Sequence, residues 1–269
     1  MKELKLAVIG KDVSASTSPQ IHNFIAARMG NKISYEKISI PENEFENKIG
    51  EIFKELDGFN VTIPYKLAII PSLKTVVGDA KTFGAVNTVT TCDLRGNNTD
   101  GLGFSMMLQN NGVNVKGKSA LVLGAGGAGR SVSKKLLEAG ANVSVYDTVY
   151  DNVRRLASEF SGIAPLKSIE NKPYFLIVNA TGVGMHKTIG QSPVSERLIS
   201  LCEVATDLIY TPEKSRFLQI AENYGKRIIN GEGMLFYQAY FSECIYFGST
   251  PDNGQAEQLF KQYQRENLQ

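Results

Sequence analysis

The most informative segment of this chain reads Ser119-Ala120-Leu121-Val122-Leu123-Gly124-Ala125-Gly126-Gly127-Ala128-Gly129. Its apolar beginning predicts a buried strand, and the Gly-x-Gly-x-x-Gly pattern from Gly124 predicts a tight turn that opens a helix running toward Gly140. Glycines suit this turn because a pyrophosphate must approach the backbone closely at a helix N-terminus, where free N–H groups and the helix dipole attract anions. An ordinary Gly-rich turn is the alternative, but the position between a strand and a helix favours a dinucleotide site.

The residues that follow support a dinucleotide-binding sheet. The next strand, Asn142 to Tyr146, ends at Asp147, about twenty residues past the glycines, where a ribose-binding carboxylate belongs. A later apolar strand, Phe175 to Val178, leads into the small-residue loop Asn179-Ala180-Thr181-Gly182, which is either a surface turn or part of the ligand-binding edge of the sheet. Strands and helices alternate from Ser119 to about Asn230, which predicts a Rossmann-type doubly wound sheet.

The first half of the chain alternates in the same way, which predicts an α/β domain with a mainly parallel sheet. We expect strands at 6–9, 33–40, 59–63 and 86–92, helices at 18–29, 41–56 and 101–111, and a turn at 93–96. Two helical stretches, Met234 to Phe247 and Gln255 to Tyr263, should return to this first domain. No flexible Gly/Ser linker separates the halves, so we expect two domains that face a common cleft, with a boundary near residue 100.

The composition narrows the class of protein. The chain has 269 residues, of which 42% are hydrophobic and 21% charged, and its net charge is +2, so neither nucleic acid nor an anionic membrane is an expected partner. The three cysteines form no CxxC pair, which suits neither a disulfide framework nor a zinc site and favours a reducing cytoplasm without a metal. No apolar run is long enough for a signal peptide or a membrane span.

Two residues of the first half are candidates for acid/base chemistry. Lys66 follows a strand and a Pro-fixed turn, so its ammonium is expected at the edge of the sheet, although a surface lysine could cap such a turn. Asp100 precedes a helix, where capping is the simpler role. Together they would form a proton relay in which the carboxylate orients the ammonium. The two histidines, His22 and His186, are weaker candidates because one lies inside a helix and the other in a loop.

The segment Ser16-Thr17-Ser18-Pro19 places hydroxyl groups just before a helix. Ser18 is the expected N-cap, Pro19 occupies the favoured first turn, and Gly30 is the expected end of the helix. Two hydroxyls beside free helical N–H groups would also suit a substrate carboxylate.

Taken together, the chain resembles the shikimate dehydrogenase family (shikimate/quinate 5-dehydrogenases) over nearly its whole length. The resemblance rests on Ser16-x-Ser18-Pro19 with His22-Asn23, Asn60-Val61-Thr62-x-Pro64-x-Lys66, Gly84-Ala85-Val86-Asn87-Thr88, Asn98-Thr99-Asp100-Gly101, Gly124 to Gly129, Asn179-Ala180-Thr181, Asp207-x-x-Tyr210-x-Pro212 and Gly231-x-Gly233-Met234-Leu235-x-x-Gln238.

The resemblance implies an NAD(P)-dependent oxidoreductase that reversibly reduces 3-dehydroshikimate to shikimate, in the biosynthesis of chorismate and aromatic amino acids. Residues 1–101 with the helices of 238–269 would form the substrate-binding domain, and residues 102–237 the dinucleotide-binding domain. A small-molecule substrate and a monomer or homodimer are implied as well.

The resemblance also implies roles for individual residues. Lys66 would be the acid/base residue, with Asp100 beside it. Ser16 and Ser18 would hold the substrate carboxylate. The remaining substrate-binding positions would be Thr62, Asn87, Tyr210 and Gln238. The cofactor-binding positions would be Gly124, Ala125, Gly126, Gly127 and Ala128 at the pyrophosphate, Asp147 at the adenosine, Leu208, Gly231 and Met234 near the nicotinamide, and Thr181 as a further contact.

The chain departs from the family pattern in three places. Ala15 stands where the family usually has His, and Asp12 where Pro is common. The resemblance therefore does not predict the conformation of the carboxylate-binding loop. A segment that usually carries Trp reads Ile245-Tyr246-Phe247, which we interpret as a packing variation. The third departure replaces the family's Asn-Arg-Thr with Tyr146-Asp147-Thr148.

This last change bears on the cofactor. The family's Arg grips the 2′-phosphate of NADP, whereas the Asp147 carboxylate can accept hydrogen bonds from the free ribose hydroxyls of NAD. The change therefore predicts a preference for NAD over the family norm, NADP. In the competing interpretation Asp147 only begins a turn, Asp151 is the N-cap of the next helix, and Arg154 or Arg155 holds the phosphate.

Other functions remain open at this level. A quinate or dual quinate/shikimate dehydrogenase would use the same polar residues, because quinate differs chiefly by one hydroxyl and a saturated ring. A non-catalytic dinucleotide-binding sensor would share the fold, but it would have no need for both Lys66 and Asp100. A dehydrogenase acting on folates is less favoured, because Ser16, Asn87 and Gln238 suit a polyhydroxy acid.

Overall fold

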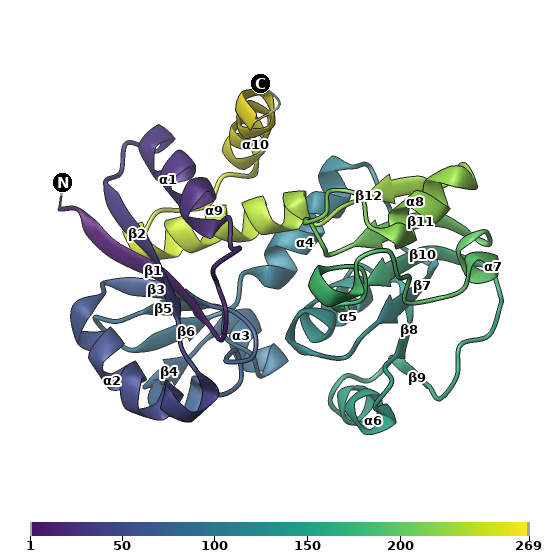
Figure 1. Cartoon of the computed structure of the whole chain (residues 1–269), viewed down its shortest axis with the longest axis horizontal. Helices are drawn as coiled ribbons and strands as arrows, with labels where there is room; N and C mark the ends of the chain where they lie inside the picture. The colour runs from purple at the N-terminus through teal and green to yellow at the C-terminus, as the bar shows by residue number, and fades with distance from the viewer. Residues whose placement is uncertain (1, 268–269) are drawn as a thin grey trace. The chain divides into compact units, whose positions relative to one another are not determined.

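Each half of the chain builds its own six-stranded sheet, and a computed structural model describes both over residues 2–267 (Figure 1). The chain divides into two units. One contains the residues up to Gly103 and those from Leu235 onward, and the other is Phe104–Met234. The chain therefore passes from one unit to the other within α4 (Asp100–Asn110) and within α9 (Glu232–Phe247).

The second unit is the predicted doubly wound fold, and the prediction is confirmed. Its strand order is β12-β11-β10-β7-β8-β9, and every neighbouring pair is parallel. The order reverses between β7 and β10, the point at which such sheets bind ligands beyond the carboxyl ends of their strands. The strands are β7 (Ser119–Leu123), β8 (Asn142–Tyr146), β9 (Ala164–Leu166), β10 (Tyr174–Asn179), β11 (Cys202–Asp207) and β12 (Arg227–Ile229).

The core of this unit explains why its central strands are apolar runs. A parallel sheet covered on both faces buries nearly every strand residue, and Leu121, Leu123 and Ile177 are each at most 2% exposed. The helices are α5 (Gly127–Glu138), α6 (Tyr150–Glu159), α7 (Glu196–Ile199) and α8 (Arg216–Asn223). Pro165 is accommodated in β9 because β9 is an edge strand.

The first unit has the strand order β2-β1-β3-β5-β6-β4. The strands β1 (Leu4–Gly10), β2 (Ile33–Ser39) and β3 (Gly58–Val61) are parallel. However, β5 (Thr88–Thr90) runs antiparallel to β3 and to β6 (Arg95–Asn97), and the short β4 (Thr75–Val76) runs parallel to β6.

The predicted turn at 93–96 is therefore wrong in part, because β6 begins at Arg95. Two strands joined by so short a connection can pair only as an antiparallel hairpin. Leu94, with φ 50°, makes the reversal between them. Strand β4 and the helix α3 (Gly78–Phe83) were not predicted, because elements this short carry too little periodicity to be recognised.

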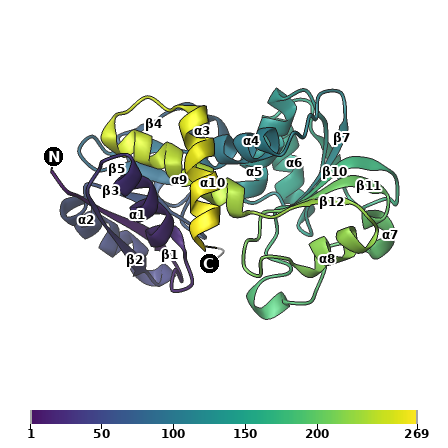
Figure 2. The same cartoon turned by 90° about the horizontal axis from the view of Figure 1, so that it is seen from above.

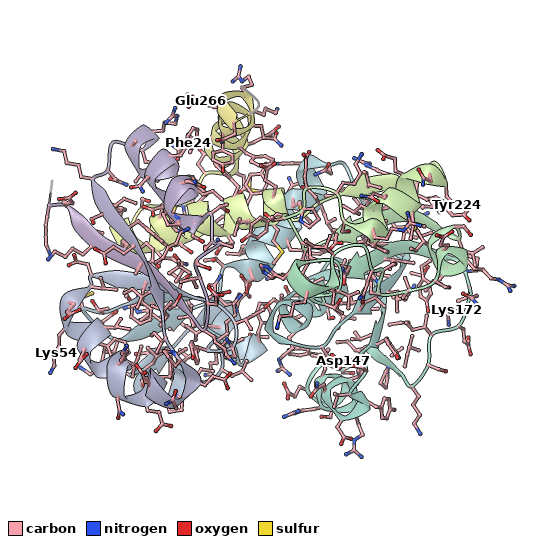
Figure 3. All side chains as sticks on the ribbon, in the orientation of Figure 1. Phe24, Lys54, Asp147, Lys172, Tyr224 and Glu266 are labelled. Carbon is pink, nitrogen blue, oxygen red and sulfur yellow. The ribbon has the colours of Figure 1, made fainter. Side chains whose placement is uncertain are left out.

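The helices of the first unit include its C-terminal pair. Besides α3, they are α1 (Ser18–Arg28), α2 (Phe45–Glu55), most of α9, and α10 (Asn253–Asn267). Two 3₁₀ turns lie in this unit as well, at Glu42–Glu44 before α2 and at Ile70–Ser72. Helix α10 lies beside α1 (Figure 1, Figure 2), where Phe24 meets Tyr263 edge to face with ring centroids 5.2 Å apart. Arg28 also pairs at 2.6 Å with Glu266, which Figure 3 labels on α10 together with Phe24 on α1.

Two further observations concern the whole described chain. All three cysteines are free thiols. Within residues 2–267, no helix combines the length and the apolar character that crossing a bilayer requires.

Candidate active site

Lys66 and Asp100 form a direct ion pair. Lys66 follows the turn after β3, and its carbonyl accepts a hydrogen bond from Val86 N at 2.7 Å, which fixes the backbone at this point. Its Nζ donates to Asp100 Oδ2 at 2.5 Å, and the two side chains are only 15% and 7% exposed. A lysine so enclosed is aimed at a fixed position rather than solvated.

Asn87 joins this pair to the C-terminal helix α9. Its Nδ2 lies 2.9 Å from Asp100 Oδ1, 2.9 Å from Thr99 Oγ1 and 3.2 Å from Gln238 Oε1. Asn87 is 2% exposed and Gln238 8% exposed. Four of the predicted site residues, Lys66, Asn87, Asp100 and Gln238, therefore form one connected cluster.

A layer of buried polar residues lies behind the cluster, and its role was not predicted. Ser242 Oγ lies 2.8 Å from Thr88 Oγ1 and 3.1 Å from Thr99 Oγ1, and it donates to the carbonyl of Gln238 at 2.9 Å. Asn60 Nδ2 donates to the Asn87 carbonyl at 3.1 Å. The only sequence signal for Ser242 was a small polar residue within a mostly apolar helix.

Ser16 and Ser18 lie together at the start of α1, but the predicted N-cap is wrong. The helix begins at Ser18 itself, and the capping position is Thr17, whose side chain makes no capping bond. Ser16 Oγ instead accepts from Ser18 N at 3.2 Å and donates to Ser18 Oγ at 3.0 Å. The Ser16 hydroxyl thus accepts the hydrogen bond of the Ser18 N–H, which has no partner within the helix. Gly30, with φ 74°, ends the helix as predicted.

Asp12 organises the loop before Ser16. Its Oδ1 accepts from Ser14 N at 3.0 Å and from Ser14 Oγ at 2.6 Å. Lys37 Nζ donates to the Ser14 carbonyl at 2.8 Å. These bonds hold the loop in place.

Not every predicted substrate residue joins the Lys66 cluster. Within residues 2–267, neither Ser16, Ser18 nor Thr62 makes a hydrogen bond to Lys66, Asp100 or Asn87. The Thr62 N–H bonds to the Ile9 carbonyl at 2.9 Å. Tyr210 belongs to the other unit, in the segment that follows β11.

The two histidines have other surroundings. His22 is fully buried, and its Nδ1 lies 2.6 Å from Glu243 Oε1 in α9. His186 is exposed, in a 3₁₀ turn (His186–Thr188) with φ 48°.

The glycine-rich turn after β7 is shaped by close backbone contacts. A Cβ on Gly129 would lie 2.0 Å from the carbonyl oxygen of Gly124, and a Cβ on Gly124, whose φ is 100°, would lie 2.9 Å from that of Ala180. A Cβ on Gly126 would meet nothing within 4 Å. Gly126 is the capping residue of α5, and it has no side chain that could bond to the N–H groups of the first turn. This cradle fits a pyrophosphate.

Asp147 lies directly after β8 (Figure 3) and touches this turn. Its Oδ2 accepts from Ala125 N at 2.8 Å, and its Oδ1 accepts from Val149 N at 2.8 Å. Each carboxylate oxygen retains capacity for a further donor.

Asp151 is not the N-cap of α6. The helix begins at Tyr150 with Val149 at the capping position, so Asp151 lies in the first turn. The Val149 N–H itself bonds to Asp147. Arg154 pairs with Asp151 at 3.3 Å, and Arg155 bonds to Asn152 at 3.0 Å. Both arginines thus contact residues of their own helix.

Three further predicted cofactor-binding positions gather at the carboxyl edge of the sheet. Thr181 donates from both N and Oγ1 to Asn179 Oδ1, at 3.1 and 2.6 Å. Leu208 N donates to the Asn179 carbonyl at 2.9 Å. A Cβ on Gly231 would lie 2.1 Å from the Leu208 carbonyl oxygen, so only glycine permits this approach. The fourth position, Met234, lies in the first turn of α9 and is 8% exposed.

Comparisons with known proteins agree with one another. A family model described as the shikimate dehydrogenase substrate binding domain matches residues 8–89. The chain is 36% identical over 262 residues to the Carboxydothermus hydrogenoformans protein named shikimate dehydrogenase (NADP(+)), covering 93% of this chain and 94% of that protein.

Solved structures of shikimate dehydrogenases resemble this chain over nearly its whole length. The Thermus thermophilus shikimate 5-dehydrogenase in complex with NADP(H) and shikimate superposes with a TM-score of 0.85 at 35% identity, covering 96% of this chain and 99% of that one. A Listeria monocytogenes shikimate 5-dehydrogenase in complex with shikimate and NAD gives a TM-score of 0.81 at 27% identity, covering 96% of each chain.

Proposed function

The chain belongs to the shikimate dehydrogenase family, and we infer that it catalyses the reversible reduction of 3-dehydroshikimate to shikimate with a nicotinamide dinucleotide. The observation that carries this inference is the enclosed Lys66–Asp100 pair, joined through Asn87 to Gln238. A binding module would have no need for a nearly buried acid/base pair.

We propose that Lys66 transfers the proton. During reduction its Nζ would donate a proton to the oxygen of the substrate carbonyl, and during oxidation the same nitrogen would accept the proton from the hydroxyl. Asp100 accepts one N–H of the ammonium at 2.5 Å, which leaves the other N–H groups for substrate. The carboxylate thus orients the proton donor and balances its charge.

The remaining polar residues would fix the substrate. Asn87 and Gln238 would bind ring hydroxyls beside Lys66, with Thr62 and Tyr210 as further contacts. Ser16 and Ser18 would bind the carboxylate, because their hydroxyls and the first N–H groups of α1 are grouped at one helix N-terminus. The first unit would accordingly bind the substrate, and the second the dinucleotide.

The second unit would hold the dinucleotide. Residues Gly124 to Ala128 would hold the pyrophosphate on the N–H groups of α5, and Thr181, Leu208, Gly231 and Met234 would flank the nicotinamide. When bound, the nicotinamide supplies or accepts the hydride.

We further propose that the enzyme prefers NAD, although the relatives are named for NADP(+). Asp147 contacts the glycine-rich turn directly, so its carboxylate lies where a bound ribose would begin. A 2′-phosphate carries about −1.5 to −2 charges. At ~5 Å and an effective dielectric constant of ~20–80, each unit of repulsion costs ~1–3 kcal/mol, which corresponds to roughly ten-fold or greater discrimination. The NAD-bound Listeria structure shows that NAD occurs in a related protein.

The function is tested by an absorbance assay of reduced nicotinamide with purified protein. Shikimate and quinate are each combined with NAD and with NADP. We expect turnover with shikimate to exceed turnover with quinate. Faster turnover of quinate would make the chain a quinate dehydrogenase, and dinucleotide binding without turnover of either acid would favour a sensor.

The cofactor preference is tested by the ratio of kcat/KM for NAD to that for NADP in the wild type, Asp147→Asn and Asp147→Arg. The asparagine variant removes the charge but keeps an acceptor oxygen for the turn, so its ratio should fall by roughly ten-fold or more. Arginine should lower the ratio further, although it also loses the bond to Ala125 N. Asp151→Asn is the matched control and should leave the ratio unchanged. A wild-type ratio well below one that does not respond to Asp147→Asn would overturn the proposal.

A further inference from the structure

Asp207, the last residue of β11, is a fully buried carboxylate with no ion-pair partner within residues 2–267. Its Oδ1 accepts from Asn179 Nδ2 and from Ile209 N, each at 3.0 Å, and its Oδ2 accepts from Ser215 Oγ at 2.5 Å. Burying an unpaired carboxylate is unfavourable, and these three donors are what the fold provides in compensation.

The first donor connects Asp207 to the Thr181 loop. The Asn179 amide uses Nδ2 for Asp207 and for the Val183 carbonyl, at 3.0 and 3.1 Å. This fixes the orientation of the amide, so that its Oδ1 faces the N–H and the hydroxyl of Thr181. If the amide turned over, the two Thr181 donors would face an NH₂ group instead of an oxygen.

The other two donors fasten the segment that follows β11. The Ile209 N–H bonds to the Asp207 carboxylate, while the Ile209 carbonyl accepts from Gly231 N at 3.1 Å. At the far end of the segment, Ser215 bonds to the same carboxylate and also caps α8 by accepting from Leu218 N at 3.4 Å. One side chain therefore holds both ends of residues 208–215.

We propose that Asp207 is a positioning residue whose ionised carboxylate holds Thr181, Leu208 and Gly231 in the arrangement that receives the nicotinamide half of the dinucleotide. The proposal rests on the proposed function, because that function assigns these three residues to the nicotinamide side. Asp207 acts through Asn179 and Ile209 and needs no contact of its own with the dinucleotide.

Protonation should loosen this arrangement, because a protonated carboxyl has one acceptor oxygen fewer for the same three donors. Burial raises the pKa of Asp207 to about 6, while the bonds from Ser215, Ile209 and Asn179 act in the opposite direction. The charged residues of the adjoining segment and α8 pair elsewhere, Lys214 with Glu222 at 2.8 Å and Arg216 with Glu196 at 3.0 Å. Further charged residues nearby in the chain are Glu203 in β11, Glu213 before α8, Lys226 after it and Arg227 in β12, and none is among the causes of this pKa shift.

The test measures dinucleotide binding directly, by fluorescence titration of NADH and NADPH without shikimate, in the wild type, Asp207→Asn and Ser215→Ala. In the wild type, the Kd should rise as the pH falls through about 6. Asp207→Asn should weaken binding roughly 10- to 100-fold at neutral pH, since it replaces a charged acceptor, and should abolish that pH dependence. The KM for shikimate should stay unchanged.

Ser215→Ala removes one hydrogen-bond donor but keeps the charge of Asp207. The rise in Kd on acidification should therefore begin at a higher pH than in the wild type. If Asp207→Asn does not fold, the Kd of Ser215→Ala as a function of pH tests the proposal instead. An unchanged Kd with an unchanged pH profile in the folded variants would overturn the proposal, because a residue that only stabilises the unit would alter the unfolding midpoint and not the profile. Failure of the proposed function would instead appear as absent shikimate turnover while the Kd still responds to Asp207→Asn.

Discussion

At the scale of single residues, the proposed proton transfer depends on the ion pair between Lys66 and Asp100. Lys66 has one carboxylate, Asp100, at 2.5 Å, and that carboxylate is held from its other oxygen by Asn87 at 2.9 Å. Asp100 therefore does more than begin a helix, which was the simpler interpretation of its position.

Lys66→Ala should lower kcat by roughly 10²–10⁴-fold, the usual contribution of a positioned acid/base group, while dinucleotide affinity stays nearly unchanged. The measurement is steady-state kinetics combined with a separate binding titration. Lys74→Ala is the control, because Lys74 is an exposed lysine of the same unit. Near-normal turnover in Lys66→Ala would remove Lys66 from the mechanism.

Asp100→Asn should also lower kcat, by about 10²-fold, because the amide keeps one acceptor oxygen but loses the charge that balances the ammonium. The double variant Lys66→Ala/Asp100→Asn should be no slower than Lys66→Ala alone, since residues that act as a unit are not additive. Additive losses would show that Asp100 acts independently of Lys66.

At the scale of elements, one buried pair connects α1, which carries Ser18, to α9, which carries Gln238. His22 and Glu243 are both fully buried, with Nδ1 and Oε1 2.6 Å apart. The His22 ring stacks on Tyr35 with centroids 4.4 Å apart. Among residues 2–267, His22 Nε2 and Glu243 Oε2 find no hydrogen-bond partner, so the pair satisfies only part of its hydrogen-bonding capacity.

Glu243→Ala should destabilise the first unit by ~3–5 kcal/mol, because it leaves His22 buried without its partner. The double variant His22→Leu/Glu243→Leu should lose much less than the sum of the single variants, since apolar replacement removes both unsatisfied groups. Denaturant unfolding of all variants checks this. Additive losses would show that the two side chains stabilise the unit separately.

At the scale of the whole molecule, each unit has its own core, and the second unit carries a pH-dependent contribution to stability. Burial raises the pKa of Asp207 from 3.8 to about 6. A carboxyl whose pKa is raised on folding stabilises the fold fully below its unfolded pKa, and this contribution is lost as the pH rises through the folded pKa. Carboxyls with lowered pKa, such as Asp93 beside Thr90 and Arg95, act in the opposite sense.

The difference in unfolding free energy between the wild type and Asp207→Asn should therefore depend on pH. Between pH 7 and pH 5 it should shift in favour of the wild type by roughly 1–2 kcal/mol, and most of the change should be complete near pH 4. Denaturant titrations of both proteins across this range measure the shift, and taking the difference cancels the contributions of the other carboxyls. A constant difference would mean that Asp207 titrates normally.

Local patterns were enough to predict the doubly wound unit and the glycine-rich turn. The strand Ser119–Leu123 has the predicted bounds because apolar periodicity and turn glycines are written in neighbouring residues. Lys66 and Asp100 could likewise be selected from short motifs, and the family resemblance named Asn87 and Gln238 as candidates.

Partners distant in sequence could not be predicted, because packing chooses them. Asn87 meets Gln238 across 151 residues and Thr88 meets Ser242 across 154, and no periodicity encodes which atoms meet. The capping residues were misjudged by one or two positions, because local sequence does not fix a helix end to the residue: Thr17 rather than Ser18 precedes α1, and Val149 rather than Asp151 precedes α6. Asp207 looked like one letter of a motif, and its importance appears only when burial removes water from a carboxylate and leaves three neighbours to replace it.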